Sequence, residues 1–303
     1  MDDSTSAAAV SKVRPAALAS VIANVGIVVT GGIVRVTGSG LGCDRWPTCD
    51  GTSVVPLAGD EASWHAYIEF GNRLLTFVVL AAAVWVVLAI RRHTPGRKDL
   101  VRLGWLQPAG VFGQALLGGV TVLTDLNPLV VAAHFLLSMV VIAAAVVLLD
   151  RVTAQHVDPR PATAPDHEPD VARLRWIGVV LLVVGAAVLV LGTLVTAAGP
   201  HAGDAGTPRL GLDIRSTAFA HADAVWLLVG LTVATMLMGW ATGRERVARA
   251  AAILFAIELG QGAIGYLQYA TGIPPALVSL HLLGASLVWV GVLRTSLALS
   301  AAR

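Results

Sequence analysis

The chain has 303 residues, of which 56% are hydrophobic and 13% are charged, and its formal net charge is +2. Soluble domains carry about 25% charged residues, so this composition excludes an ordinary soluble domain. Apolar runs of about 20 residues recur, and each is long enough to cross the ~30 Å hydrocarbon core of a bilayer. We therefore expect the surroundings of the chain to be a lipid bilayer, and we expect no nucleic-acid partner.

The apolar runs predict an all-α, polytopic membrane protein with eight transmembrane helices, because continuous apolar segments of this length satisfy their backbone groups in lipid as helices. The first run is too long for the hydrophobic part of a cleavable signal peptide and is interpreted as the first span. In chain order the predicted spans are 15–36, 67–90, 101–123, 129–149, 174–197, 217–240, 247–268 and 276–298.

The lysines and arginines predict the orientation. Of the 21 in the chain, all but five fall in segments that lie on one side of the predicted membrane. An excess of these residues marks cytoplasmic segments. We predict a multi-pass protein of the cell membrane with both termini in the cytoplasm. The five on the outer side are Arg35, Arg45, Arg73, Arg209 and Arg215.

A stretch rich in proline and charge, 151–172, is interpreted as a cytoplasmic linker. It separates an N-terminal half, 1–150, from a C-terminal half, 173–303, and each half has four spans. An even number of spans gives both halves the same orientation, so we predict a parallel internal repeat of two pseudo-symmetric four-helix bundles. Residues that match at a constant offset of 147 include Gln114 with Gln261, Gly118 with Gly265, Pro128 with Pro275, and His134 with His281.

In the second half, His221 and His281 lie near the outer ends of two spans. Inward side chains on facing helices build haem sites in bundles, and haem iron accepts imidazole as an axial ligand. An ionisable residue inside a membrane is costly and therefore points to function. These two histidines predict a bis-histidine haem site near the outer face. The alternative is that they are polar side chains that help the helices to pack.

In the first half, the residue that matches His221 is Asn72, a poor iron ligand. The site at His134 is therefore predicted to be five-coordinate or ligated in another way. His65 lies seven residues before Asn72, about 10 Å further along a helix, and reaches this site only if the helix begins late or the loop folds inward.

Three polar residues, Glu69, Asn72 and Arg73, share one helix face at positions i, i+3 and i+4. Arg73 either pairs with Glu69 or meets an anionic group such as a haem propionate. Glu69 is a candidate acid/base or charge-stabilising group at the mouth of the membrane, and the alternative is an ion pair at the interface.

Three further features remain outside these sites. Cys43 and Cys49 lie in an outer, oxidising loop and predict a disulfide, either as a staple or in a redox or gating role. Glu258, inside a span, serves either a proton path or an interhelical hydrogen bond. Histidines of the connecting segments are expected to be solvated: His93, His156, His167 and His201.

Taken together, the eight spans, the loop TGSGLGCDRWPTC, the segment EFGNR and the helix starts HFLLS and HLLGA resemble the haem A synthase family, from about residue 15 to 298. The resemblance implies an enzyme that oxidises the C8 methyl group of haem O to a formyl group, which gives haem A for terminal oxidases. It implies a haem b cofactor held by His221 and His281, with the substrate haem near His134 and Asn72. Haem O synthase (protohaem farnesyltransferase) is a further expected partner.

The family's E-x-x-H-R pattern falls on Glu69 and Arg73, which are the expected catalytic residues, and its first cysteine pair falls on Cys43 and Cys49. The departure is Asn72, where the family usually has histidine, so the second ligand of the substrate haem stays open. The alternative activity is a b-type cytochrome that relays electrons between quinol and a partner without converting haem.

Overall fold

The computed structural model describes residues 11–56, 64–153 and 168–301. Long helices dominate these ranges, and no β-strand occurs in them. The helices are α2 (Arg14–Val36), α3 (Trp64–His93), α4 (Lys98–Leu123), α5 (Pro128–Thr153), α6 (Glu168–Ala198), α7 (Ile214–Ala241), α8 (Glu245–Ala270) and α9 (Pro275–Ala301).

All 8 helices are long and apolar enough to cross a membrane, which confirms the predicted all-α, polytopic fold. Their ends extend beyond the predicted spans by up to six residues, because a helix continues past the hydrocarbon core into polar surroundings. Most of the predicted linker, with His156 and His167, lies outside the described residues.

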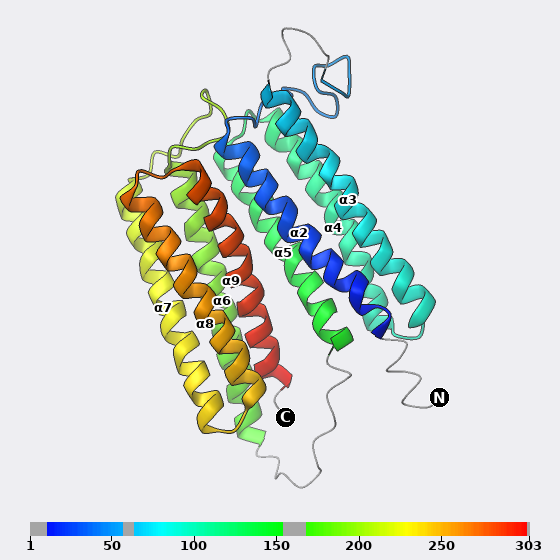
Figure 1. The fold of residues 1–303 in the computed structure, drawn as a ribbon, viewed down its shortest axis with the longest axis vertical. Helices are drawn as coiled ribbons and strands as arrows, with labels where there is room; N and C mark the ends of the chain where they lie inside the picture. The colour runs from blue at the N-terminus through cyan, green and yellow to red at the C-terminus, as the bar shows by residue number, and fades with distance from the viewer. Residues whose placement is uncertain (1–10, 57–63, 154–167, 302–303) are drawn as a thin grey trace.

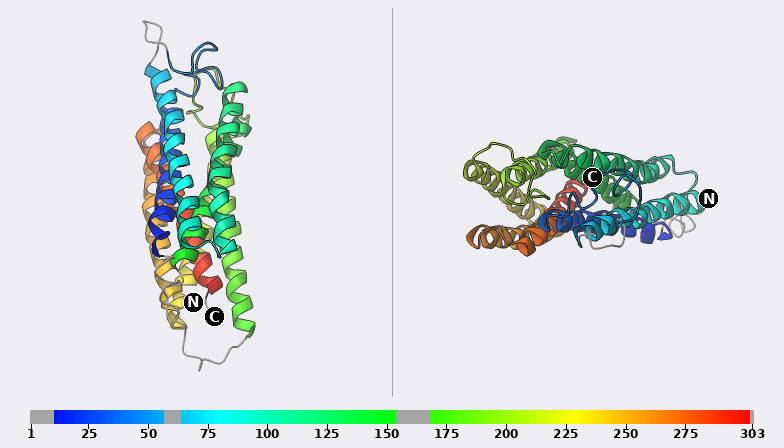
Figure 2. Two further views of the ribbon diagram at one scale, coloured as in Figure 1. Left: turned by 90° about the vertical axis from the view of Figure 1, so that its right-hand side faces the viewer. Right: turned by 90° about the horizontal axis from the view of Figure 1, so that it is seen from above.

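The helices form two groups of four (Figure 1 and Figure 2). Within the first group α2 packs on α3 and α5, and α4 packs on the same two helices. The second group repeats this ring with α6, α7, α8 and α9. The groups meet where α9 lies against α2 and α5. This arrangement supports the proposed internal repeat, and the division at 151–172 stays a prediction.

The start of α2 and the end of α9 lie at the same end of the molecule, which we call the terminal end (Figure 1). The opposite end carries the segments 37–56, 124–127, 199–213 and 271–274, and we call it the loop end. All the candidate site residues lie in the loop-end half of their helices or in the loops themselves.

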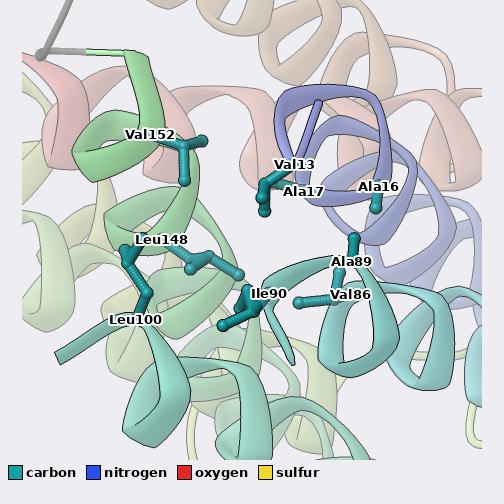
Figure 3. Packing of buried hydrophobic residues seen from close by; sticks show 9 residues of the cluster. All are labelled: Val13, Ala16, Ala17, Val86, Ala89, Ile90, Leu100, Leu148 and Val152. Atoms are coloured by element: carbon teal, nitrogen blue, oxygen red, sulfur yellow. The ribbon is translucent and has the colours of Figure 1, made fainter. Parts of the chain in front are cut away.

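Small and branched apolar side chains fill the bundle interiors. Figure 3 shows the cluster at the terminal end of the first bundle, built by Val13, Ala16, Ala17, Val86, Ala89, Ile90, Leu100, Leu148 and Val152. Helices in lipid associate mainly through close packing and interhelical hydrogen bonds, since lipid tails are as apolar as the side chains. Gly239 shows the first effect, because a Cβ there would lie 2.7 Å from the Ala248 nitrogen. Trp289 shows the second, donating to the Met139 carbonyl at 2.9 Å across the two bundles.

Polar bonds tie the two bundles together at the loop end. The Arg35 guanidinium donates to the carbonyls of His201 at 2.5 Å and Thr196 at 2.7 Å. Gly40 N–H donates to the Gly203 carbonyl at 2.8 Å. The His201 ring is half-buried, and its Nε2 lies 2.8 Å from the Ile273 carbonyl. The expectation that His201 is solvated was therefore wrong, because the segment 199–213 folds onto the segment 271–274.

Candidate functional site

The helices α5, α7 and α9 carry the candidate histidines, and the residue at which each helix begins sets the depth of its imidazole. α5 and α9 start at Pro128 and Pro275, and proline favours the first helical position because its missing N–H is not needed there. His134 and His281 each follow six residues later, so they lie at the same depth.

α7 starts after Asp213, whose carboxylate accepts the Ser216 hydroxyl at 2.6 Å and the Ser216 N–H at 2.8 Å. These two bonds lower the pKa of Asp213 below its ordinary value. His221 follows seven residues into α7, at a depth similar to that of His281.

In the second bundle, His221 and His281 each keep a ring nitrogen without a described protein partner. His221 Nδ1 lies 3.1 Å from the Val188 carbonyl, so this nitrogen carries the proton and Nε2 is left available. His281 Nδ1 is buried and has no partner within the described ranges. His221 comes from α7 and His281 from α9, so the two rings are supplied by different helices of the second bundle.

Glycines cradle both rings. A Cβ on Gly192 would lie 3.2 Å from His221 Cε1, and one on Gly265 would lie 3.3 Å from His281 Cε1. Gln261 Nε2 donates to the His281 carbonyl at 2.8 Å. Two imidazoles with available nitrogens are side chains that could hold a haem iron.

The first bundle repeats one side of this arrangement. A Cβ on Gly118 would lie 3.3 Å from His134 Cε1. Gln114 Nε2 donates to the His134 carbonyl at 3.2 Å and to Ser138 Oγ at 2.8 Å. His134 Nδ1 is also buried without a partner in the part of the chain described. The Gly–His and Gln–His contacts thus recur at the offset of 147 residues.

The position opposite His134 differs between the two bundles, because Asn72 stands where the second bundle has His221. Asn72 Oδ1 lies 2.8 Å from Thr30 Oγ1, so the carboxamide is bound to α2. His65 does not replace it, because α3 already begins at Trp64 and His65 lies about two turns away from Asn72. His65 Nδ1 instead lies 2.9 Å from Ser39 Oγ, and its ring stacks on Trp64 at 3.8 Å. The site at His134 therefore has one imidazole where the second bundle has two.

Glu69 and Arg73 pair with each other and hold the loop that follows α2. Glu69 Oε1 accepts from Arg73 at 2.5 Å, and Glu69 Oε2 accepts the Cys43 N–H at 2.6 Å. Arg73 also donates to the carbonyls of Cys43, Arg45 and Thr48 at 3.0–3.1 Å. Each guanidinium nitrogen thus has a protein acceptor. Of the two expected alternatives for Arg73, the structure shows the pair with Glu69.

Cys43 and Cys49 form the predicted disulfide. Both are buried, and they pack with Ala66 and Phe70 of α3. The bridge closes the segment 43–49 into a small loop that lies on α3. This geometry favours the staple among the roles considered from the sequence.

The partners of two buried polar residues, Glu258 and Gln107, were not predicted from the sequence. Thr232 Oγ1 donates to Glu258 Oε1 at 2.9 Å, so Glu258 makes the interhelical hydrogen bond that was one of its two alternatives. Ser20 Oγ donates to Gln107 Oε1 at 3.0 Å between α2 and α4. An isolated polar residue in a span was the only available signal, and it does not identify the partner. Asp223 is exposed, whereas His221 is half-buried.

Residues 15–206 match the family of cytochrome oxidase assembly proteins, COX15-CtaA. Three curated relatives named heme A synthase illustrate the similarity. The protein of Lysinibacillus sphaericus is 33% identical over 133 residues, which is 44% of this chain and 42% of the relative. That of Geobacillus kaustophilus is 30% identical over 113 residues, 36% and 32% of the two chains. That of Bacillus pumilus is 34% identical over 127 residues, 40% and 39%.

Each of these alignments covers less than half of the relative's own length. The match to the family is longer and covers more than half of this chain. This match, on a chain with eight helices long and apolar enough to cross a membrane, shows that the chain belongs to the COX15-CtaA family of cytochrome oxidase assembly proteins.

Proposed function

We propose that the chain is a haem A synthase, which oxidises the C8 methyl group of haem O to a formyl group and so supplies haem A to terminal oxidases. The observation that carries this proposal is the difference between the two bundles. A resident cofactor is held best by two axial ligands, as His221 and His281 can provide. A substrate that must enter and leave suits a site with the single imidazole of His134.

In this proposal the second bundle holds haem b through His221 and His281, and the bound haem supplies one-electron redox chemistry. The bond from His221 Nδ1 to the Val188 carbonyl holds its ring in one orientation and would leave Nε2 to bind the iron. Gln261 holds the backbone at His281 in the same way. These contacts would hold the two histidines in position to bind the haem.

Haem O binds in the first bundle between His134 and Asn72. The Asn72 carboxamide is bound to Thr30, so it leaves that side of the site without an imidazole. Water is the proposed oxygen source. Conversion of the methyl group and one water to a formyl group releases four electrons and four protons. The electrons would pass one at a time through the second bundle to an external electron acceptor, and the protons would go to the surroundings.

Glu69 and Arg73 are the proposed catalytic pair. The buried Glu69 carboxylate places a negative charge at the mouth of the first bundle, where it stabilises cationic character on the substrate. Glu69 and Arg73 have a second role in this proposal. Their hydrogen bonds to the 43–49 loop hold that loop in place over the end of the first bundle.

We place the protein in the cell membrane with the loop end outward and both termini in the cytoplasm, because most lysines and arginines lie toward the terminal end. Haem O synthase, as the source of the substrate, is the proposed partner.

The experiment is to purify the protein in detergent, record a reduced-minus-oxidised spectrum, add haem O together with an artificial electron acceptor, and extract the pigments. A b-type band and the appearance of haem A are expected. A b-type band with unchanged haem O would instead identify a cytochrome that only relays electrons, and the proposed function would be wrong.

A further inference from the structure

Trp46, in the loop closed by the disulfide, lies directly on the backbone of α4. A Cβ on Gly119 would be 2.5 Å from Trp46 Cδ2 and 2.6 Å from Cε2. Real Cβ atoms do not approach that closely, so any larger residue at position 119 would displace the indole. Trp46 is only half-buried, which leaves part of the indole surface uncovered by the protein.

The next residue of α4 places the indole beside the histidine of the first bundle. Gly118 contacts the imidazole of His134, and Gly119 contacts Trp46. Successive residues of a helix point about 100° apart, so the two rings lie on adjoining sides of α4 at one height. His134 comes from α5, whereas the loop with Trp46 is held by Arg73 of α3. The two rings therefore border the same end of the first bundle.

The loop is fixed on both sides of Trp46. Arg73 binds the carbonyl of Arg45, just before the tryptophan, and that of Thr48, shortly after it. The Cys43–Cys49 disulfide closes the same segment. The indole is thus held in place before any ligand arrives, which lowers the entropic cost of a contact with that ligand.

Among the described residues of the second bundle, no loop tryptophan packs on a glycine in the way that Trp46 packs on Gly119. At the offset of 147 residues, the position of Gly119 is taken by Tyr266, whose side chain is 64% exposed. The corresponding connecting segment, 199–213, contains no cysteine. The indole of Trp46 accordingly lies in the first bundle, which has the single imidazole of His134 and is the proposed binding site of haem O.

We propose that Trp46 is a substrate-contacting residue, whose indole forms one wall of the haem O site and packs against the flat, largely apolar macrocycle. This inference rests on the proposed function and adds a contact to its first site. Aromatic rings contribute large apolar area and favourable ring–ring geometry, so the wall raises the affinity of the site for a planar tetrapyrrole.

The test uses the full-length protein loaded with haem b. The dissociation constant of haem O is measured by absorbance titration without an electron acceptor, and KM and kcat are measured separately with one. Trp46→Ala is expected to raise the dissociation constant and KM about tenfold, with a smaller rise for Trp46→Phe. The b-type spectrum and kcat should stay close to those of the wild type.

Gly119→Ala provides an independent variant, because the new methyl group pushes the indole away without removing it. It should weaken haem O binding as Trp46→Ala does, and the double variant should be no weaker than the single ones, since both changes act on one contact. Tyr266→Ala, at the matched position of the second bundle, is the control and should leave haem O binding unchanged.

Unchanged haem O binding in Trp46→Ala and Gly119→Ala, while the wild type converts haem O, would overturn this inference alone. A fall in kcat with unchanged binding would overturn it as well. If Trp46→Ala lost its b-type band through misfolding, Trp46→Phe and Gly119→Ala would decide. A wild-type protein that forms no haem A defeats the proposed function instead.

Discussion

Replacing Arg73 by lysine tests whether this residue holds the 43–49 loop in place. Arginine spreads its donors over a planar fork, and here they reach three backbone carbonyls and the Glu69 carboxylate. A lysine has one nitrogen and cannot reach all four acceptors. Arg73→Lys therefore keeps the charge and the pair with Glu69 but loses at least two charge-assisted bonds.

Each such bond contributes about 1.5–3 kcal/mol. The Arg73 side chain is 22% exposed, so water replaces part of what is lost. We expect the closed loop to lose about 3 kcal/mol relative to the open loop, which is roughly a hundredfold change in their ratio.

Reduction of the disulfide by an added thiol measures this ratio. Cys43 and Cys49 are 0% and 5% exposed, so a thiol reaches the sulfurs only when the loop opens. The rate of reduction in Arg73→Lys should rise roughly a hundredfold. Arg209→Lys, which alters an arginine bonded to the Pro200 carbonyl in the other loop, is the control and should leave the rate unchanged. A rise of less than about threefold in Arg73→Lys would refute the reasoning, because it corresponds to less than about 1 kcal/mol.

Three other substitutions test the remaining assignments. His281→Ala should abolish the b-type spectrum, and an unchanged spectrum would exclude it as an axial ligand. Glu69→Ala should keep haem b but block conversion of haem O, so retained conversion would leave Glu69 with a structural role only. Thr232→Val removes the donor to the buried Glu258 carboxyl and should lower the free energy of unfolding by about 1–3 kcal/mol, as measured by denaturant titration in detergent; a loss below about 0.5 kcal/mol would show that this bond contributes little.

The sequence predicts the spans and the depth of the histidines well, for a physical reason. Lipid forces each apolar run into a helix, and a helix that starts at Pro128 or Pro275 fixes how deep a histidine six residues later will lie. The repeat then makes the match between His134 and His281 visible without any knowledge of the packing.

The contacts of the loops could not be obtained in this way. Arg73 binds three carbonyls because of the path that the loop takes, and carbonyls carry no signal in the sequence. The pairing of Asn72 with Thr30 depends on α2, whose match to α6 in the repeat is loose. Trp46 contacts Gly119, which is more than 70 residues later in the sequence. The sequence does not distinguish a glycine in an apolar span that faces lipid from one that faces a helix or an indole.

The Arg35 bonds at the loop end have a consequence for electron flow between the bundles. In the proposed reaction, electrons leave the substrate in one bundle and arrive at the haem in the other, and the rate of such a transfer falls steeply as the gap between donor and acceptor widens. Arg35 crosses from α2 to the Thr196 carbonyl at the end of α6 and to the His201 carbonyl beyond it. If the proposed reaction takes place, Arg35 would act as a spacer that holds the loop ends of the two bundles at a fixed separation.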